Sequence, residues 1–383
     1  MNQIVCISTS PWKPLPMSKQ QILSRIPNSE IIYFDPPVTY IAPLKDKAAK
    51  AKLKAHKLPA DRINDHIVTY TMPPVIPFFN KCRFINKLNQ RKLAKFVRKK
   101  MAEHGFESPI LWAYSHTCAD ISDHIPHSAL VYHCVDRHSA FKGLLNPELV
   151  DSMEYDLTKQ ADMVFCTAAG LQHRLLPHNK KAVFIPNGAN YELFSQADTP
   201  QECPEEIKDI TGPILGFTGA LQECIEYSFV AHAAKEKPNW TFVFIGNRLP
   251  AADLCGIDSM PNVRILGVKP QSELPKYIAH FDVCLNLFKS DELTKDVSPL
   301  KFYEYLCTGK PIVTTPEPQQ VMAFKDMIHV AATADEFIEK CEAAINDSSD
   351  EEKRIRMDAG RSCSWDSRAS QFVSILREMN ILE

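Results

Sequence analysis

The sequence predicts an α/β fold built from two successive doubly wound domains, each with a parallel sheet. Short apolar runs alternate with polar or helix-forming segments from residue 4 onward. An acidic, proline-containing stretch at 202–211 interrupts the alternation, which then resumes. At 383 residues the chain is long enough for two sizeable cores. Because strands that alternate with helices form parallel sheets covered on both faces, we expect two Rossmann-like halves.

The apolar runs give the expected order of elements. In the first half the predicted strands are 4–8, 30–34, 67–70, 110–113, 129–134, 163–167 and 182–185, and the predicted helices include 18–26, 81–104 and 147–160. In the second half the predicted strands are 214–218, 241–245, 263–267, 283–287, 311–315 and 328–330, and the predicted helices include 225–234, 273–279 and 334–346. We therefore place a first domain at 1–195, a linker at 196–211, a second domain at 212–365 and a terminal helix at 366–383.

Composition and short motifs argue against several classes of protein. Hydrophobic residues make up 45% and charged residues 23% of the chain, which is ordinary for a soluble globular protein. The first residues predict a strand and not a signal peptide. The 12 cysteines include no CxxC pair, so neither a disulfide framework nor a zinc site is predicted. No GxGxxG follows the first strand, which disfavours a dinucleotide-dependent dehydrogenase. We expect a reduced, cytoplasmic protein without a metal.

The charge is distributed unevenly along the chain. Residues 1–195 hold 25 basic and 16 acidic side chains, whereas the remainder holds 19 and 30. Within 41–104 there are 16 basic and 4 acidic residues, concentrated in helix-forming stretches at 46–58 and 91–100. Such a surface could dock on the anionic cytoplasmic face of an inner membrane. A solvated helix face and an attraction for an anionic acceptor remain alternatives, and the lack of interleaved aromatics disfavours nucleic acid.

The stretch at 296–315 is the most informative part of the chain. Ser298 is a good N-cap and Pro299 suits the first helical position. A short helix is then expected over 300–308, with Gly309 as its left-handed end and a buried strand directly after it. Lys301 and Glu304 are three residues apart, so they share one face close to the positive end of this helix. Together they suit a diphosphate and a ribose diol, although an ordinary i,i+3 salt bridge is the alternative.

This stretch resembles a known signature. Asp296, seven residues, Glu304 and then Tyr-Leu-Cys-Thr-Gly-Lys-Pro resemble the nucleotide-sugar motif of retaining family 4 glycosyltransferases, in which Glu-x7-Glu is followed by a helix and Gly-x-Pro-Val-Val. The form Pro-Leu-Lys-Phe-Tyr-Glu-Tyr-Leu is similar to a branch that includes teichuronic-acid and exopolysaccharide enzymes. The resemblance implies that Glu304 contacts the donor ribose and that the first acid, here Asp296, lies near the sugar hydroxyls.

The resemblance also implies a fold and an activity. The fold would be GT-B, two Rossmann-like domains with a cleft between them and a terminal helix crossing back to the first. The activity would be retaining, metal-independent transfer of a hexose-type sugar from a nucleoside-diphosphate sugar, first of all a UDP-sugar, to a saccharide or lipid-linked acceptor. No cofactor beyond this co-substrate is expected. No enzymic nucleophile is needed, because the leaving diphosphate helps to deprotonate the acceptor.

Further donor-site residues are expected at strand ends of the second half. Gly219 could let backbone amides face a phosphate, although such glycines are often simple turn residues. The family usually carries an Arg and a Lys shortly after this glycine, whereas the chain has Leu-Gln-Glu-Cys-Ile-Glu at 221–226, which leaves Lys301 as the best cation. The predicted donor-binding residues are Gly219, Gly246, Asn247, Gly267, Val268, Lys269, Ser298, Pro299, Leu300, Lys301 and Glu304.

In the first half, polar side chains follow two apolar strands, at the sheet edge where doubly wound domains bind ligands. Asp136 and His138 could touch the transferred sugar or the acceptor hydroxyl, and His116 and Arg137 are expected on the acceptor side. The alternative for each histidine is a satisfied structural role. The predicted catalytic residues are Asp136, His138, Lys301 and Asp296.

Two other functions stay open. An inverting transferase or a nucleotide-sugar epimerase on the same fold would use Asp136 as its base. A non-catalytic partner subunit would explain the missing Arg and Lys, whereas the intact Lys301 and Glu304 argue against it.

Overall fold

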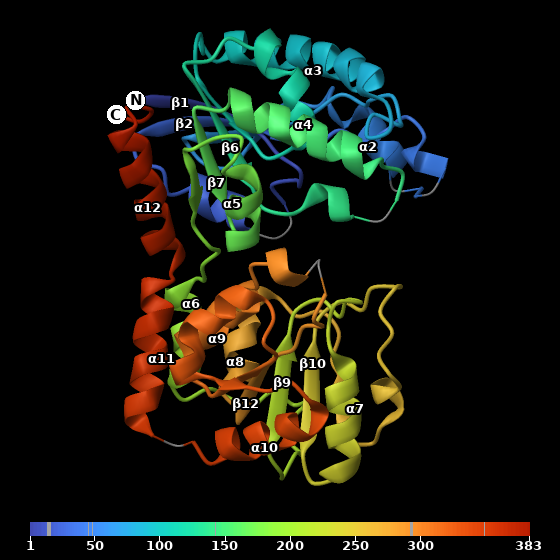
Figure 1. Ribbon diagram of the computed structural model, residues 1–383, viewed down its shortest axis with the longest axis vertical. Coiled ribbons are helices and arrows are strands. Elements are labelled where there is room, and N and C mark those ends of the chain that lie inside the picture. Colours follow the sequence, from blue (N-terminus) through green and yellow to red (C-terminus); the bar gives the residue numbers. More distant parts are fainter. Residues whose placement is uncertain (14–16, 45, 48, 142, 292–293, 348) are drawn as a thin grey trace. The chain divides into compact units, whose positions relative to one another are not determined.

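The computed structural model describes residues 1–13, 17–44, 46–47, 49–141, 143–291, 294–347 and 349–383. These residues form two compact units, unit 1 (Met1–Pro186 and Ala369–Glu383) and unit 2 (Asn187–Arg368) (Figure 1). The division falls earlier than the predicted boundary after residue 195. The predicted linker at 196–211 is not a free connection, because Ala197 and Ile207 are buried in the core of unit 2.

In the described residues, unit 1 contains an eight-stranded sheet of order β3-β4-β2-β1-β5-β6-β7-β8. All of its strand pairs are parallel except β3 with β4. The strands are β1 (Asn2–Ile7), β2 (Ser29–Asp35), β3 (Asp61–Arg62), β4 (Ile67–Thr71), β5 (Ile110–Ala113), β6 (Ala129–Cys134), β7 (Met163–Cys166) and β8 (Ala182–Phe184). The α-helices are α1 (Ser18–Leu23), α2 (Ala49–Ala55), α3 (Arg83–Glu103), α4 (Pro147–Gln160), α5 (Ala169–Leu175) and the end of α12 (Trp365–Glu378).

Helices cover both faces of this sheet, as its alternating side chains require. One face packs against α3, α4 and α5 through residues such as Val97, Met153 and Leu171. On the other face, Phe372 of α12 stacks near His133 and Phe165 of the central strands. The end of the terminal helix therefore belongs to unit 1, as expected from the resemblance.

Unit 2 contains a six-stranded parallel sheet of order β11-β10-β9-β12-β13-β14 in the described residues. The strands are β9 (Ile214–Thr218), β10 (Thr241–Ile245), β11 (Val263–Ile265), β12 (Val283–Asn286), β13 (Ile312–Thr314) and β14 (His329–Val330). The α-helices are α6 (Tyr191–Phe194), α7 (Tyr227–Glu236), α8 (Leu274–Ile278), α9 (Leu300–Thr308), α10 (Ala334–Ile345), α11 (Asp350–Ser362) and the start of α12. Helices α7 and α10 cover one face, and α8 and α9 cover the other.

Both sheets reverse their strand order beside their first strand. In unit 1 the sheet grows from β1 toward β2 on one side and toward β5 on the other; in unit 2 it grows from β9 toward β10 and toward β12. Ligands of open α/β sheets bind outside the carboxyl ends of the strands at such a switch point. The fold thus selects two places, one in each unit, where functional side chains are expected to gather.

The predicted elements agree with the structure to within a few residues at their ends. The sequence analysis missed the edge strand β3 and the helices α5, α6 and α11. Helix α2 forms within the basic stretch predicted to be helical, of which residue 48 lies outside the described residues. In the part of the chain that the structure describes, no helix is long and apolar enough to cross a membrane.

Candidate functional site

The unit 2 site begins at the N-terminus of α9. The helix has the predicted bounds, and Gly309 ends it with φ of 71°. The predicted cap is wrong: the capping residue is Pro299, without a side-chain hydrogen bond. The Ser298 hydroxyl instead accepts the backbone N–H of Asn187 at 3.0 Å, and the Asn187 side chain donates to the Ser298 carbonyl at 2.9 Å. Ser298 therefore ties the start of α9 to the first residues of unit 2.

The Lys301 ammonium lies between two aromatic rings. Its Nζ is 4.5 Å from the ring centroid of Phe217, in β9, and 4.6 Å from that of Phe288, just after β12. Burial lowers its pKa to about 8, against the opposing influence of Cys224 and Glu304. Among the described residues no carboxylate forms an ion pair with it, so the i,i+3 salt bridge with Glu304 is not formed. Lys301 is a poorly solvated cation at the switch point, which suits an anionic ligand.

Glu304 lies one turn further along the same helix. Its Oε1 accepts a hydrogen bond from Gln271 Nε2 at 3.1 Å. Burial raises its pKa to about 7, although Gln271 and Lys301 oppose the shift. The sequence analysis missed Gln271; the signal available was a polar residue two positions after Lys269 and four after the strand-end Gly267.

Three glycines follow the ends of β9, β10 and β11. Gly219, Gly246 and Gly267 have φ values of 129°, 155° and 70°. A Cβ on Gly246 would lie 1.9 Å from the carbonyl oxygen of Gly219, and one on Gly219 would lie 3.0 Å from Cε of Lys301. The N–H of Gly219 itself donates to the Ile245 carbonyl at 2.8 Å, and the expectation that Gly219 lets neighbouring amides face a phosphate stays a prediction. Gly246 lets its strand end approach Gly219, and Gly219 leaves room for Lys301.

The other predicted donor residues are placed less tightly. Val268 is 67% exposed, directly after Gly267. Asn247 accepts a hydrogen bond from the backbone of Leu221. Lys269 forms an ion pair with Glu206, so its charge is engaged within unit 2. Asp296, the first acid of the motif, is half-buried in a short 3-10 helix at Thr294–Asp296.

The segment at 221–226 supplies a thiol near Lys301 where a cation was expected. Cys224 is close enough for its charge state to influence the pKa of Lys301. Burial raises the pKa of the Cys224 thiol, while Lys301 lowers it. The Cys224 carbonyl accepts the backbone N–H of Lys289 at 2.9 Å, which fastens this segment beside the residues that follow β12.

In unit 1 the structure brings together His116 and His138 at the switch point. Their ring centroids are 5.0 Å apart. His138 Nε2 is 3.2 Å from the carbonyl oxygen of Tyr114, and His116 Nε2 is 2.9 Å from Oδ1 of Asn80. Burial and the nearby His138 lower the pKa of His116 to about 3, so its imidazole is neutral. His116 Nδ1 is buried and has no hydrogen-bond partner among the described residues.

A lysine that the sequence analysis missed completes this group. Lys19, only 6% exposed, donates from Nζ to the hydroxyls of Thr9 and, at 3.1 Å, of Ser10. Burial lowers its pKa, and the Asp136 carboxylate opposes that shift. Desolvation raises the pKa of Asp136, while His138 and Lys19 lower it. The available signal was a lysine in the first turn of the helix that follows the first strand.

Arg137, the remaining predicted residue, is half-buried, and its Nε has no hydrogen-bond partner in the described part of the chain.

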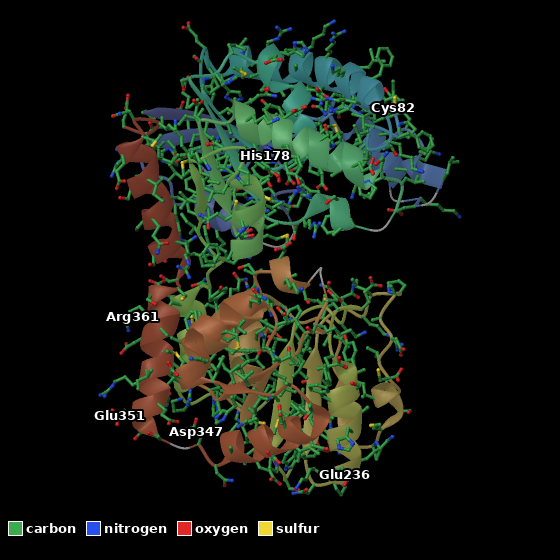
Figure 2. The ribbon with its side chains drawn as sticks, in the orientation of Figure 1. Cys82, His178, Glu236, Asp347, Glu351 and Arg361 are labelled. Atoms are coloured by element: carbon green, nitrogen blue, oxygen red, sulfur yellow. The ribbon has the colours of Figure 1, made fainter. Side chains whose placement is uncertain are left out.

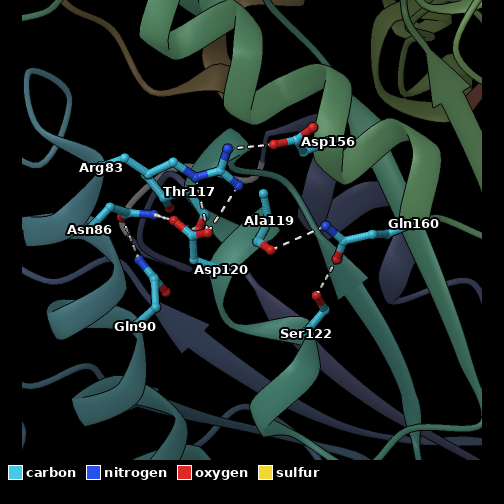
Figure 3. A network of polar contacts seen from close by, with 9 residues as sticks. All are labelled: Arg83, Asn86, Gln90, Thr117, Ala119, Asp120, Ser122, Asp156 and Gln160. Carbon is cyan, nitrogen blue, oxygen red and sulfur yellow. Dashed lines mark hydrogen bonds and ion pairs between the residues drawn. The ribbon is translucent and has the colours of Figure 1, made fainter.

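A polar network holds the short helix that carries His116 (His116–Asp120) against α3 and α4 (Figure 3). Asp120 accepts from Arg83 Nη2 at 3.0 Å and from Asn86 Nδ2 at 2.8 Å. Gln160 accepts from the Ser122 hydroxyl at 2.6 Å and donates to the Ala119 carbonyl. Each of these polar groups has a partner, so the network fixes the backbone next to His116.

Within the described residues, no group of three or more His, Cys, Asp or Glu side chains is arranged to hold a metal ion. The expected metal independence stays a prediction.

Comparisons with known proteins agree with this geometry. Residues 226–374 match the family model described as "Glycosyl transferase-like". The chain is 27% identical over 255 residues to the putative teichuronic acid biosynthesis glycosyltransferase TuaH of Bacillus subtilis (strain 168). That alignment covers 62% of this chain and 64% of the relative, so just under two thirds of the relative's length is matched.

Solved structures match over nearly the whole chain. Sucrose-phosphate synthase from Thermosynechococcus elongatus has a TM-score of 0.71 at 14% identity and covers 99% of both chains. A trehalose-6-phosphate protein from E. coli, solved with UDP-2-fluoro glucose, has a TM-score of 0.71 at 9% identity over 100% of both chains. HepE of Anabaena, solved with UDP and glucose, has a TM-score of 0.64 at 15% identity, covering 98% and 99%.

These comparisons confirm the predicted fold and the predicted resemblance to glycosyltransferases. They do not test the site residues. The chain has the GT-B fold, and its residues 226–374 match the glycosyl transferase-like family model.

Proposed function

We propose that the chain is a glycosyltransferase that moves a sugar from a nucleoside-diphosphate sugar to a saccharide or lipid-linked saccharide in the synthesis of a cell-surface polysaccharide. The observation that carries this proposal is the pair Lys301 and Glu304 at the start of α9, beside the strand-order reversal of unit 2. TuaH supports the polysaccharide context, and the structures solved with UDP or a UDP-sugar make a UDP-sugar the first donor to test.

In this proposal α9 binds the donor nucleotide. Glu304 accepts hydrogen bonds from the ribose diol, with Gln271 orienting its carboxyl group. Lys301 and the amides at the helix N-terminus bind the diphosphate. The nucleobase lies against Gly267 and the exposed Val268, and Asp296 lies toward the sugar hydroxyls.

The proposed chemistry retains the anomeric configuration and needs no metal. The acceptor hydroxyl attacks the anomeric carbon on the face from which the diphosphate departs, and its proton passes to an oxygen of the leaving diphosphate. The protein contributes by positioning the reactants and by stabilising negative charge that grows on the leaving group. Because Lys301 sits on aromatic rings and is poorly hydrated, its charge acts strongly on a neighbouring phosphate.

The acceptor side of the proposal uses the unit 1 group. His116, Arg137, His138 and Asp136 contact the transferred sugar or the acceptor, and Lys19 keeps a positive charge beside Asp136. We place the reaction in the cytoplasm, at the cytoplasmic face of the membrane that would present a lipid-linked acceptor. Nucleic acid is not among the proposed partners.

A second candidate rests on Asp136. Its raised pKa suits a general base, which an inverting transferase or an epimerase would require. Nuclear magnetic resonance of the product's anomeric proton separates the candidates: a retained configuration supports the front-face reaction, and an inverted one supports Asp136 as base. A non-catalytic subunit would release no nucleotide and form no product.

The first experiment measures thermal stabilisation by UDP, GDP, dTDP, CMP and ADP. A ligand that binds only the folded state raises its stability, by about 2.7 kcal/mol at a hundred times its Kd. We expect one nucleotide to stabilise the wild type and the Glu339→Gln control, in which an exposed carboxylate of α10 is neutralised. Glu304→Gln should lose most of this stabilisation. If Glu304→Gln responds like the wild type, the donor assignment is wrong.

A further inference from the structure

Unit 1 carries a groove of about 430 Å³ among the segments that follow the carboxyl ends of its strands β2, β4 and β6. It lies between the segment around α2 and the loop before α3, and its walls are mostly apolar. The groove is lined by Val38, Ile41, Ala49, Phe78, Phe79 and Leu144, among others. Cys82, labelled in Figure 2, directly precedes α3 and lies two residues after Asn80 of the groove lining.

Large apolar side chains are exposed in the groove lining and in the segments next to it along the chain. Leu44 is 86% exposed and Phe84 is 68% exposed, and Phe78 and Leu144 are also exposed. Phe78 has φ of 66°, a left-handed conformation that a bulky residue adopts only at a cost of about 1–3 kcal/mol. Clustered exposed apolar groups of this kind mark an interaction surface on a folded protein.

Basic residues lie on α2, which borders the groove, and on α3, which follows it along the chain. Lys50 and Lys54 lie on one face of α2, Lys52 lines the groove itself, and Lys87 and Arg91 are exposed on α3. In the described part of the chain none of these five forms an ion pair. Of the 4 acidic residues within 41–104, Asp61 forms an ion pair with Lys13 and Glu103 forms one with Lys100. The mostly apolar groove thus has the three lysines of α2 beside it, together with the acidic Asp46 in its lining.

The groove is continuous with the unit 1 candidate site. Asn80 lines the groove, and its Oδ1 is 2.9 Å from Nε2 of His116. One side chain thus joins the apolar surface to a histidine of the proposed acceptor side.

We propose that this docking surface, made of Leu44, Phe78, Phe84 and Leu144 with Lys50, Lys54 and Lys87, binds the surface of an anionic lipid bilayer. The apolar side chains enter the headgroup–acyl boundary, and the lysines contact the anionic headgroups. A polyanion in solution would use the lysines but not the exposed leucine and phenylalanines. A neutral apolar partner would not need the lysines beside the groove. Anionic lipid matches both features.

The consequence for the reaction rests on the proposed function: docking would present a lipid-linked acceptor at the Asn80–His116 end of the groove. The docking itself can be tested without any glycosyl transfer, so the two proposals can fail separately.

The test measures co-sedimentation of the full chain with vesicles of phosphatidylcholine, with and without phosphatidylglycerol. We expect binding only to the anionic vesicles, weakened by salt because the Debye length is only about 10 Å at 0.1 M ionic strength. The double variants Leu44→Ser with Phe84→Ser, and Lys50→Glu with Lys54→Glu, should each bind at least about tenfold more weakly, given roughly 1 kcal/mol per lysine near the surface.

Matched controls lie in unit 2. Ile355→Ser removes an exposed apolar side chain, and Lys235→Glu with Lys276→Glu makes the same change in net charge as the α2 variant. Both controls should bind like the wild type. The proposal is wrong if the wild type binds neither vesicle or binds both equally. It is also wrong if only the lysine variant loses binding, because the surface would then bind polyanions such as RNA.

Nucleotide-dependent thermal stabilisation, measured on the same samples, separates the two proposals. Vesicle binding without any nucleotide effect would leave docking in place and contradict the glycosyltransferase proposal. A nucleotide effect without vesicle binding would do the reverse.

Discussion

The ammonium group of Lys301 lies 4.5 Å from the ring centroid of Phe217, so a cation of α9 lies over an aromatic ring of β9. Phe288, which follows β12, approaches the same ammonium at 4.6 Å. Strands β9 and β12 are the pair at which the strand order of unit 2 reverses. Helix α9 thus places the Lys301 ammonium at the strand-order reversal of unit 2, where ligands of open α/β sheets bind.

Donor binding should weaken above pH 8 if Lys301 binds the diphosphate. Burial lowers the pKa of this lysine to about 8, so its charge is lost as the pH rises through that value. We expect the Kd for the nucleoside diphosphate to increase roughly tenfold for each pH unit above 8. In Lys301→Arg, whose guanidinium stays charged, the Kd should be flat from pH 7 to 9.5. A wild-type Kd that is equally flat would contradict the assignment.

Glu304 should make the chain less stable as the pH rises from 4.5 to 7. Its folded pKa of about 7 exceeds the ordinary value of 4.5, so the folded state binds more protons than the unfolded state in this window. The free energy of unfolding therefore falls with rising pH there. Urea unfolding across this range should show a smaller fall for Glu304→Gln than for the wild type. Parallel curves for the two proteins would mean that Glu304 titrates normally.

Gly246→Ala should destabilise unit 2 and weaken donor binding. The added Cβ would lie 1.9 Å from the Gly219 carbonyl oxygen, and φ of 155° is unfavourable for alanine. We expect a loss of about 2–4 kcal/mol in the free energy of unfolding. Gly256→Ala is the matched control: its φ is also positive, at 76°, but its Cβ would meet nothing within 4 Å. Gly256→Ala should lower the free energy of unfolding by only about 1 kcal/mol, the cost of a positive φ for alanine without any clash. Equal losses would show that the close approach of Gly246 to Gly219 is unimportant.

Lys19→Met should shift the acidic limb of the pH–rate profile toward higher pH. The lysine's charge lowers the pKa of Asp136, so its removal should raise that pKa and delay the ionisation of the carboxyl group. The measurement is kcat/KM against pH, alongside thermal melting. Lys13→Met is the control, because Lys13 pairs with Asp61 on the surface of the same unit. A lower rate with an unshifted profile would mean that Lys19 only positions Thr9 and Ser10 and does not influence the pKa of Asp136.

The sequence was sufficient where local signals agree with the fold. The α9 bounds follow from a proline before the helix, an apolar face and a terminal glycine, and the structure contains all three features. The cap was mispredicted because Ser298 has a better partner in Asn187, which is 111 residues away in the chain. Local propensity cannot show that a distant backbone N–H competes for a hydroxyl.

The parts of the candidate site that escaped prediction depend on contacts between strands. Lys19 is beside Asp136 only because β1, β5 and β6 are neighbours in the sheet. Gln271 contacts Glu304 because the segment that follows β11 passes next to α9. In the sequence, the segment around Cys224 was notable only because it lacks the Arg and Lys that are usual in the resembled family. Its position beside Lys301 can be seen only in the folded unit.

One titration tests the assignment of Lys301 most directly. The nucleoside diphosphate that best stabilises the chain and its parent nucleoside are titrated into the wild type, Lys301→Ala and the exposed-lysine control Lys276→Ala. We predict that Lys301→Ala binds the diphosphate at least about tenfold more weakly, as expected for a lost charge-assisted contact, with nucleoside affinity unchanged. Equal losses for both ligands, or no loss for either, would contradict the claim that Lys301 binds the diphosphate.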